Sequence, residues 1–215
     1  MYDLPYHKER NELVIKDFIA AHPFAFLTGC DPAGKPVATQ VPAFLEERDG
    51  RIVLSGHLMR NTDHHKAFLH NHNVLVVFSG PHVYVSGTWY SNPRTPSTWN
   101  YMSVHARGTI RFLEGAALED LLNKTSLHFE GYDQRSPTAF QNLPRQLTGK
   151  LVSAIVAFEI EVEAMDTVFK LSQDRDIQSY LSIIEQLEKQ GEAGRAIASE
   201  MQKRMSKVFP QERGE

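Results

Sequence analysis

The segment from Ser153 to Met165 constrains the fold more than any other, because it carries the strongest β-strand pattern in the chain. Its apolar residues alternate with alanine and glutamate: Val156, Phe158, Ile160 and Val162. A period of two places the apolar side chains on one face of a strand. The other candidate strands all lie before residue 114, so this late strand is expected to close an antiparallel sheet and to reduce its free edges.

Shorter strand patterns precede this segment. Apolar runs bounded by turn residues predict strands over 24–30, 37–46, 51–57, 73–78, 82–90 and 99–110. Pro42 lacks an N–H donor and indicates a bulge or an edge. Helical spacing predicts helices over 7–22, 61–71, 114–129 and, in two pieces around Gly191, 176–207, with 130–150 irregular. The pattern predicts an α+β fold, a small barrel of six or seven antiparallel strands with peripheral helices.

The composition is that of an ordinary soluble globular protein. The chain has 215 residues, 41% of them hydrophobic, and a formal net charge of −3. Its single cysteine, Cys30, excludes an intrachain disulfide and favours a reducing compartment. No leader-like apolar run and no apolar stretch of about 20 residues occurs, so we expect a cytoplasmic protein that does not enter a membrane.

Aromatic residues concentrate between Phe78 and Gly108. This stretch contains both tryptophans, three tyrosines and two histidines: Trp89, Trp99, Tyr84, Tyr90, Tyr101, His82 and His105. Two interpretations stay open. The rings could cover a flat heteroaromatic ligand, or they could form ordinary core or a dimer seam in which Trp89, Tyr90 and Trp99 are partly exposed.

A second stretch suits a phosphate group. In the sequence Ser55-Gly56-His57-Leu58-Met59-Arg60-Asn61, a strand ends and a helix begins, with Asn61 or Thr62 as its cap. Free backbone N–H groups, the helix dipole and a guanidinium group together favour an anion. The alternative is that Arg60 only pairs with a surface carboxylate.

Other chemistries find little support. Five histidines lie between residues 57 and 72, but most are interpreted as polar helix surface, and no metal-ligand spacing accompanies them. No nucleophile elbow, dinucleotide fingerprint or P-loop occurs, and Cys30 lies on a predicted buried strand. The basic residues Lys203, Arg204 and Lys207 are interleaved with glutamates, which argues against a DNA-reading helix.

Several segments, in order, resemble those of PaiB-like proteins, a family of FMN-binding negative transcriptional regulators. They are MYDLPYHKE at the start, GHLMRN at 56–61, FSGPHVYVSGTWY at 78–90, PSTWNYMSVHARG at 96–108, AIVAFEIEV at 154–162 and KLSQDR at 170–175. The resemblance implies a split β-barrel similar to pyridoxamine-phosphate oxidases, with FMN bound by a homodimer. We expect an FMN-binding split-barrel domain over 1–173 and a C-terminal helical extension packed on the same domain over 174–215.

The resemblance assigns roles to particular residues. Thr39, Gln40 and Val41 would lie along the isoalloxazine, and Ser55, Gly56, His57, Arg60 and Asn61 would hold the ribityl phosphate. Trp99, Asn100 and His105 would approach the ring or the dimer neighbour, and Lys170, Ser172 and Gln173 would close the rim.

Four functions remain open from the sequence. The chain could be a flavin-binding homodimer that regulates transcription indirectly, an FMN-dependent oxidoreductase on a small molecule, a repressor that binds DNA directly, or a haem-binding relative. The negative charge and the mixed charge of the C-terminal helices favour the first over the third.

Overall fold

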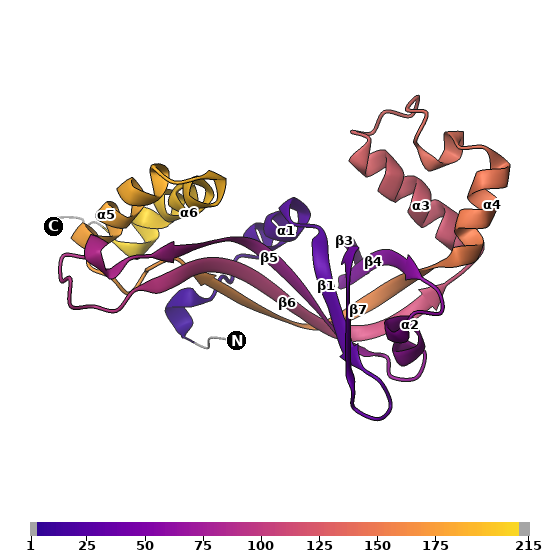
Figure 1. The fold of residues 1–215 in the computed structure, drawn as a ribbon, viewed down its shortest axis with the longest axis horizontal. Coiled ribbons are helices and arrows are strands. Elements are labelled where there is room, and N and C mark those ends of the chain that lie inside the picture. The colour runs from indigo at the N-terminus through magenta and orange to yellow at the C-terminus, as the bar shows by residue number, and fades with distance from the viewer. Residues whose placement is uncertain (1–3, 211–215) are drawn as a thin grey trace. The chain divides into compact units, whose positions relative to one another are not determined.

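The computed structural model describes residues 4–210, so the first three residues of the MYDLPYHKE motif and the last five of the 174–215 extension lie outside the described range. A seven-stranded antiparallel sheet has the order β2-β1-β5-β6-β7-β4-β3 (Figure 1). The strands are β1 Phe24–Cys30, β2 Pro36–Pro42, β3 Phe44–Arg48, β4 Arg51–Met59, β5 Asn73–Val85, β6 Thr98–Leu113 and β7 Ile155–Lys170. The helices are α1 Glu12–Ala21, α2 Asp63–Phe68, α3 Ala116–Phe129, α4 Arg145–Ala154, α5 Ile177–Glu188 and α6 Glu192–Val208. The α+β fold predicted from the sequence is confirmed.

The chain forms two compact units that are interleaved in sequence. The central unit comprises Ile19–Phe78 and His105–Met165, and the terminal unit comprises Met1–Phe18, Ser79–Val104 and Asp166–Glu215. Strands β5, β6 and β7 contribute residues to both units. The division into domains at residue 173 stays a prediction.

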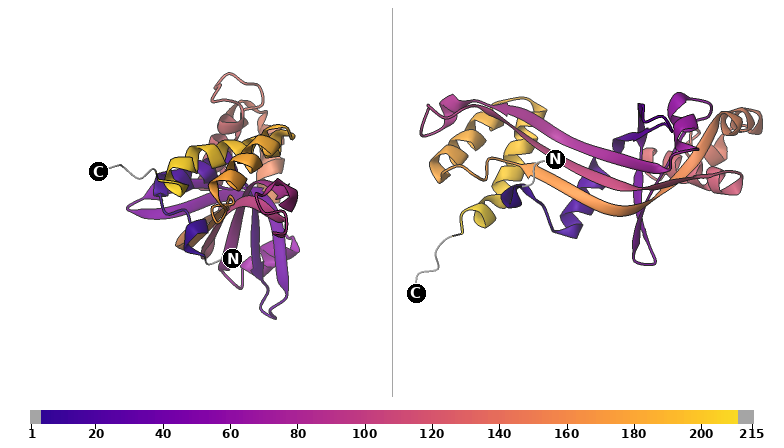
Figure 2. Two further views of the ribbon diagram at one scale, coloured as in Figure 1. Left: turned by 90° about the vertical axis from the view of Figure 1, so that its left-hand side faces the viewer. Right: turned by 90° about the horizontal axis from the view of Figure 1, so that it is seen from below.

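Strand pairing builds the core of the central unit. β1 alternates exposed and buried residues, with Ala25 and Leu27 fully buried, and pairs with β2 on one side and β5 on the other. The β1–β2 hairpin turns at residues 31–35, where Gly34 has a φ of +80°, as the turn residues predicted (Figure 2). Helix α3 packs its leucines on Ala157 of β7: Leu118, Leu121 and Leu122.

Two helices complete the terminal unit. Helices α5 and α6 lie side by side, as Figures 1 and 2 show, and flank Gly191 as predicted. Tyr180 of α5 is fully buried and donates its hydroxyl hydrogen to the carbonyl of Met201 at 2.9 Å. The two helices also bury aliphatic side chains: Ile183, Leu187, Ile197 and Ala198.

Several expected element boundaries were wrong. The first helix begins at Glu12 rather than at residue 7, because Pro5–His7 is a separate 3-10 turn. The expected strand over 37–46 divides at Ala43, next to the donor-less Pro42. The strand expected to reach residue 90 ends at Val85, because Gly87–Trp89 forms a 3-10 turn in which a Cβ on Gly87 would lie 2.3 Å from the Thr95 carbonyl oxygen.

The segment 130–150 is more regular than expected. A 3-10 turn spans Phe140–Asn142, and α4 begins directly after Pro144 and continues through Ala154. Proline is compatible with a helix start, since its missing N–H falls where the helix has no acceptor. Strand β7 therefore begins at Ile155 instead of Ser153, and it extends to Lys170.

Gly56 lies where strand β4 approaches its neighbours most closely. It pairs with Phe158 of β7, and a Cβ added at Gly56 would lie 2.6 Å from both the Phe158 ring and the Pro42 carbonyl oxygen. Phe158 is fully buried and Pro42 contributes backbone, so neither can easily move aside. The packing of the sheet thus explains this glycine without any ligand.

We predict that Gly56→Ala lowers the free energy of unfolding by about 1–3 kcal/mol, because the added methyl group overpacks the core. Urea denaturation monitored by circular dichroism measures the change. Gly149→Ala is the matched control, since Gly149 lies on helix α4 with no atom within 4 Å of the new Cβ and should be neutral or stabilising. Equal unfolding midpoints for Gly56→Ala and the parent would contradict the packing argument.

Candidate functional site

The predicted flavin-edge residues lie on an edge strand of the central unit. Strand β2 has a neighbour on one side only, β1, which it meets in the register Leu27↔Thr39, Phe26↔Gln40 and Ala25↔Val41. Gln40 is exposed, Thr39 is half-buried and Val41 is buried. An edge strand presents backbone N–H and C=O groups outward, and these suit the polar edge of a flat ring.

Ser55 lies above a small charged cavity. The cavity has a volume of about 170 Å³ and is lined by residues of β3, β4, β6, β7 and α3. Buried Glu159, the cross-strand partner of Ser55, accepts hydrogen bonds from both Arg48 and Arg111. Two guanidinium groups compensate this buried carboxylate, so the network holds β3, β6 and β7 together and leaves little unpaired charge for a ligand.

Arg60 is anchored and retains donors. Its Nε donates to the Ile155 carbonyl at 2.8 Å and its Nη1 to Glu114 at 2.7 Å. Within residues 4–210, neither the Arg60 Nη2 group nor the side-chain amide of Asn61 makes a hydrogen bond. Arg60 therefore does pair with a surface carboxylate, as the alternative interpretation stated. This pair occupies only part of the guanidinium group, which has five N–H donors.

The start of helix α2 is less open than the sequence suggested. Thr62 caps it and accepts a hydrogen bond from the His65 N–H at 3.3 Å, as predicted for this position. The Asn61 N–H donates to His65 Nδ1 at 3.1 Å, and the His64 N–H donates to Asp63 at 2.8 Å. Since these donors are bound locally, Arg60 and Asn61 side chains are the stronger phosphate candidates.

The surroundings of the histidines in this region are less polar than expected. His65 is only 6% exposed, and its ring meets the edge of Phe112 at a centroid distance of 4.9 Å. His65 is therefore an exception to the interpretation of most of these histidines as polar helix surface, because it faces β6, whereas His70 and His72 are exposed. His57 is half-buried opposite Ala157, and His105 is half-buried on β6. Among the described residues, no three His, Cys, Asp or Glu side chains are grouped to hold a metal ion.

The structure brings the predicted residues of the terminal unit together. Lys170 Nζ donates to the Trp99 carbonyl at 3.1 Å and to the hydroxyl of Thr98. Ser172, which has a φ of +61°, donates its hydroxyl hydrogen to Asn100 Oδ1 at 3.0 Å. Burial, partly opposed by Asp174, lowers the pKa of the Lys170 ammonium. The KLSQ segment thus holds the start of β6 in place.

Gln173 is the most fully bonded of these residues. Its Nε2 donates to the Phe169 carbonyl at 2.5 Å, and its Oε1 accepts from the Leu171 N–H at 2.7 Å and contacts His7 Nδ1 at 3.1 Å. His7 is 2% exposed, and burial lowers its pKa. These bonds leave Gln173 a positioning role in the loop after β7.

An aromatic cluster is exposed on the terminal unit. Trp99 and Tyr84 are 53% and 47% exposed, with ring centroids 5.9 Å apart, and His82 lies 6.2 Å from Trp99. The expectation that Tyr90 is exposed was wrong: it is 6% exposed, with the Arg175 guanidinium 4.7 Å from its ring centroid. Burial raises the pKa of the Tyr90 phenol.

Sequence reasoning missed an apolar face on the central unit. Phe24 and Phe26 of β1 are 61% and 44% exposed. Phe26 pairs with Val77 of β5, so the apolar face continues onto that strand, whereas its partner on the edge strand β2 is the polar Gln40. The signal was present, because FAFL is apolar at every position, whereas a strand with one solvated face alternates. This face marks an unpartnered sheet surface beside the edge strand.

The central unit offers groups of the chemical kind that FMN requires. The Arg60 Nη2 group and the Asn61 amide can donate to a phosphate, and the outward backbone of β2 can meet the polar edge of the flavin.

No helix among residues 4–210 has the length and apolar character that a membrane crossing requires.

We predict that acid weakens the fold through its buried histidines. Burial lowers the pKa of His57 below the usual value of about 6.5, so the folded state favours the neutral ring. This contribution to stability is complete above pH 6.5 and is lost as the pH falls, because the unfolded chain binds the proton more readily. The free energy of unfolding from urea denaturation should fall between pH 7.5 and pH 5.5. His57→Gln should reduce the slope of this free energy against pH by at most about 1.4 kcal/mol per pH unit. A parent whose midpoint rises on acidification would contradict this.

Comparisons with known proteins identify the family of the chain and agree with its fold. Residues 1–164 match a family model described as "Putative FMN-binding domain". The chain is 33% identical over 190 residues to "Protease synthase and sporulation protein PAI 2" of Bacillus subtilis, covering 87% of this chain and 89% of that protein.

Solved structures share the fold at low identity. The flavocytochrome Anf3 of Azotobacter vinelandii has a TM-score of 0.56 at 16% identity, covering 79% of this chain and 72% of that one. The FAD and haem binding protein of Mycobacterium smegmatis has a TM-score of 0.50 at 17% identity, covering 76% and 73%. The sequence match to PAI 2 and the family model together identify the family. This chain belongs to the PaiB-like family of FMN-binding proteins, whose cofactor is FMN.

Proposed function

We propose that this chain is a homodimeric FMN-binding protein that regulates gene expression indirectly. The observation that carries the proposal is the apolar face of β1, where Phe24 and Phe26 are exposed beside edge strand β2. Contiguous apolar surface of this kind marks an interface. A second copy of the chain would cover it and would enclose the flavin edge at β2.

The central unit would bind FMN at both polar ends of the cofactor, the phosphate and the edge of the ring. Arg60 and Asn61 would bind the phosphate, and the backbone of Thr39 to Val41 would meet the ring. His57 and Ser55 would lie on the strand between these points. Bound FMN supplies a centre that accepts a hydride or electrons. The chain itself would bind and orient it and exclude water.

Indirect regulation is supported by the C-terminal helices. Lys203 pairs with Glu200 at 2.7 Å, and Arg204 bridges Glu200 at 2.5 Å and Glu9 at 3.1 Å. Specific DNA binding requires cations that neutralise several phosphates, whereas these are largely neutralised within the protein. The link to regulation comes from the relative PAI 2, whose name refers to protease synthesis and sporulation.

A visible spectrum of the purified protein separates the remaining functions. Flavin bands support the proposal, whereas a Soret band would favour a haem-binding relative. Consumption of NAD(P)H with a flavin-loaded sample would instead favour an FMN-dependent oxidoreductase.

We predict that Arg60→Ala weakens FMN binding by about tenfold to a hundredfold, because it removes a charge-assisted hydrogen bond of about 1.5–3 kcal/mol. Fluorescence titration of FMN measures the affinity, and circular dichroism checks that the fold survives. Glu114→Gln is the control, since it removes the ion-pair partner of Arg60 and keeps the guanidinium group. A mutant that binds FMN as tightly as the parent would remove Arg60 from the site.

We predict a dimer that depends on Phe26. Light scattering should give twice the 24.4 kDa mass of the chain, and Phe26→Glu should weaken association by about a hundredfold or more, because a charge would be buried in an apolar contact. Leu13→Glu is the control, since Leu13 is an exposed apolar residue, at 70%, on helix α1 rather than on β1. A stable parent monomer at micromolar concentration would overturn the dimer.

We predict no tight, sequence-specific DNA binding by this chain alone. A mobility-shift experiment with promoter fragments at physiological salt should show no shift at nanomolar protein. A shift that survives competitor DNA would show that regulation is direct.

A further inference from the structure

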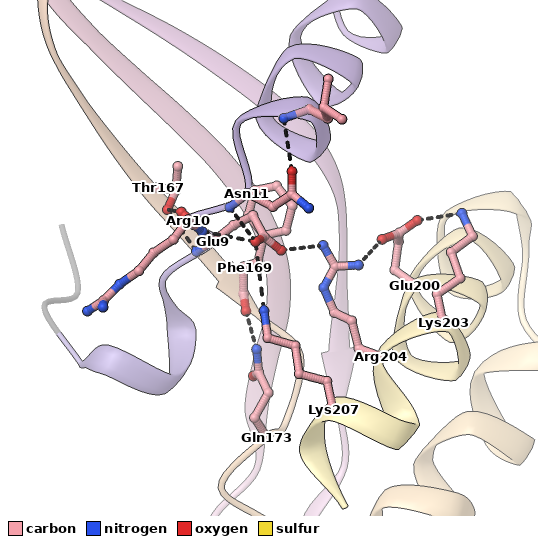
Figure 3. A network of polar contacts seen from close by, with 11 residues as sticks. Glu9, Arg10, Asn11, Thr167, Phe169, Gln173, Glu200, Lys203, Arg204 and Lys207 are labelled. Atoms are coloured by element: carbon pink, nitrogen blue, oxygen red, sulfur yellow. Dashed lines mark hydrogen bonds and ion pairs between the residues drawn. The ribbon is translucent and has the colours of Figure 1, made fainter. Parts of the chain in front are cut away.

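A small cavity in the terminal unit is lined by none of the predicted flavin residues of the central unit. It has a volume of about 180 Å³ and lies between the N-terminal segment, the end of β7 and helix α6. It is lined by Pro5, Tyr6, Lys8, Glu9, Phe169, Gln173, Arg204, Lys207 and Val208. Figure 3 shows the side chains of Arg204 and Lys207, both on α6, pointing toward Glu9 of the N-terminal segment.

The carboxylate of Glu9 is already bound by the protein. Its Oε1 accepts hydrogen bonds from the backbone N–H groups of Arg10 at 2.9 Å and Asn11 at 3.0 Å, and its Oε2 accepts one from Arg204 at 3.1 Å. Thr167 fixes its backbone, accepting from the Glu9 N–H at 2.9 Å and donating to the Glu9 carbonyl at 2.8 Å. Glu9 is 8% exposed, so this carboxylate is a rigid, neutralised part of the wall.

The ammonium group of Lys207 is bound far more loosely. Its Nζ lies 3.8 Å from Glu9 Oε1, beyond hydrogen-bond distance, and its side chain is 73% exposed. Lys8 lines the same cavity, with its Nζ 3.9 Å from Asp166. Arg204 is held by Glu9 and Glu200 and lies 5.1 Å from the centroid of the Phe169 ring. The cavity thus has three cationic lining residues and one carboxylate, which is already engaged.

The rest of the wall is apolar. Four lining residues carry apolar or aromatic surface: Pro5, Tyr6, Phe169 and Val208. Gln173 contributes its side chain, but the amide is bonded to Phe169, Leu171 and His7, as described above. Small-molecule sites combine such apolar walls with a few charged groups that orient the ligand.

We propose that this cavity binds a small organic acid with a single-ring or similarly sized apolar body. Its carboxylate would replace the long contact of Lys207 with a direct hydrogen bond. Its body would lie against Tyr6, which is 48% exposed, and Val208, since Phe169 is only 2% exposed. The volume is below the range of about 300–1,000 Å³ that drug-sized ligands occupy, which limits the ligand to about one ring.

Such a ligand would connect the N-terminal segment to the last turns of α6. Binding to the folded state alone stabilises that state in proportion to the ligand concentration. The site would give the protein an input from a small acid that is independent of FMN, and it does not rest on the proposed dimer.

Isothermal titration calorimetry of the full chain with benzoate tests the proposal, in FMN-saturated and FMN-free samples at constant ionic strength. We expect saturable binding with one site per chain, unchanged by FMN and absent with benzamide, which has the same ring and no charge. Lys207→Gln should weaken benzoate by about fivefold or more, since one charge-assisted bond is lost, and Lys207→Arg should retain it. Lys203→Gln is the matched control on the same helix, because Lys203 pairs with Glu200 outside the cavity.

Four outcomes would overturn the site. They are no saturable binding of benzoate, equal binding of benzamide, equal losses in Lys207→Gln and Lys203→Gln, and displacement of benzoate by FMN. The last would assign the cavity to the flavin. Because Lys207 is largely exposed, its substitutions should leave the fold intact, which thermal unfolding of each variant checks.

Discussion

The close approach of β4 and β6 to strand β7 is the constraint on which the sheet depends. In the sheet order, β7 lies between these two strands, and each carries a glycine where it is crowded. A Cβ on Gly56 of β4 would lie 2.6 Å from the Phe158 ring, and a Cβ on Gly108 of β6 would lie 2.0 Å from the Glu161 carbonyl oxygen. Both glycines are therefore required by packing, and the candidate site is built on strands whose spacing they permit.

Each unit contains a buried carboxylate held by guanidinium groups. Glu159 joins Arg48 and Arg111 in the central unit, and Glu9 joins Arg204 in the terminal unit. A buried charge that loses its partner is strongly destabilising, so such pairs commit the strands and helices that carry them to one arrangement. In the central unit the network tightens the sheet, whereas in the terminal unit it forms one wall of a cavity beside the largely exposed Lys207.

The candidate flavin site combines an open edge with anchored side chains. Strand β2 is an edge, and Arg60 is fixed by Ile155 and Glu114 while its Nη2 group makes no hydrogen bond to any residue from 4 to 210. A guanidinium group that is already oriented loses less conformational entropy when it binds an anion. The apolar face of Phe24 and Phe26 lies on β1, next to this edge, which is why cofactor binding and association of two chains are proposed together.

The sequence by itself determined the kind of fold, the family and the cofactor. Strand alternation, turn residues such as those at 31–35 and the cap Thr62 are local signals, and the motifs indicate the FMN-binding family by their residues and their order alone. Only the tertiary structure decided which residues are exposed and which are paired with distant residues. Tyr90 is buried under Arg175 while Trp99 is exposed, Arg60 bonds to a carbonyl 95 residues away, and Glu9 meets Arg204 across 195 residues. Exposure and pairing depend on contacts between residues far apart in the chain, which a local pattern does not encode.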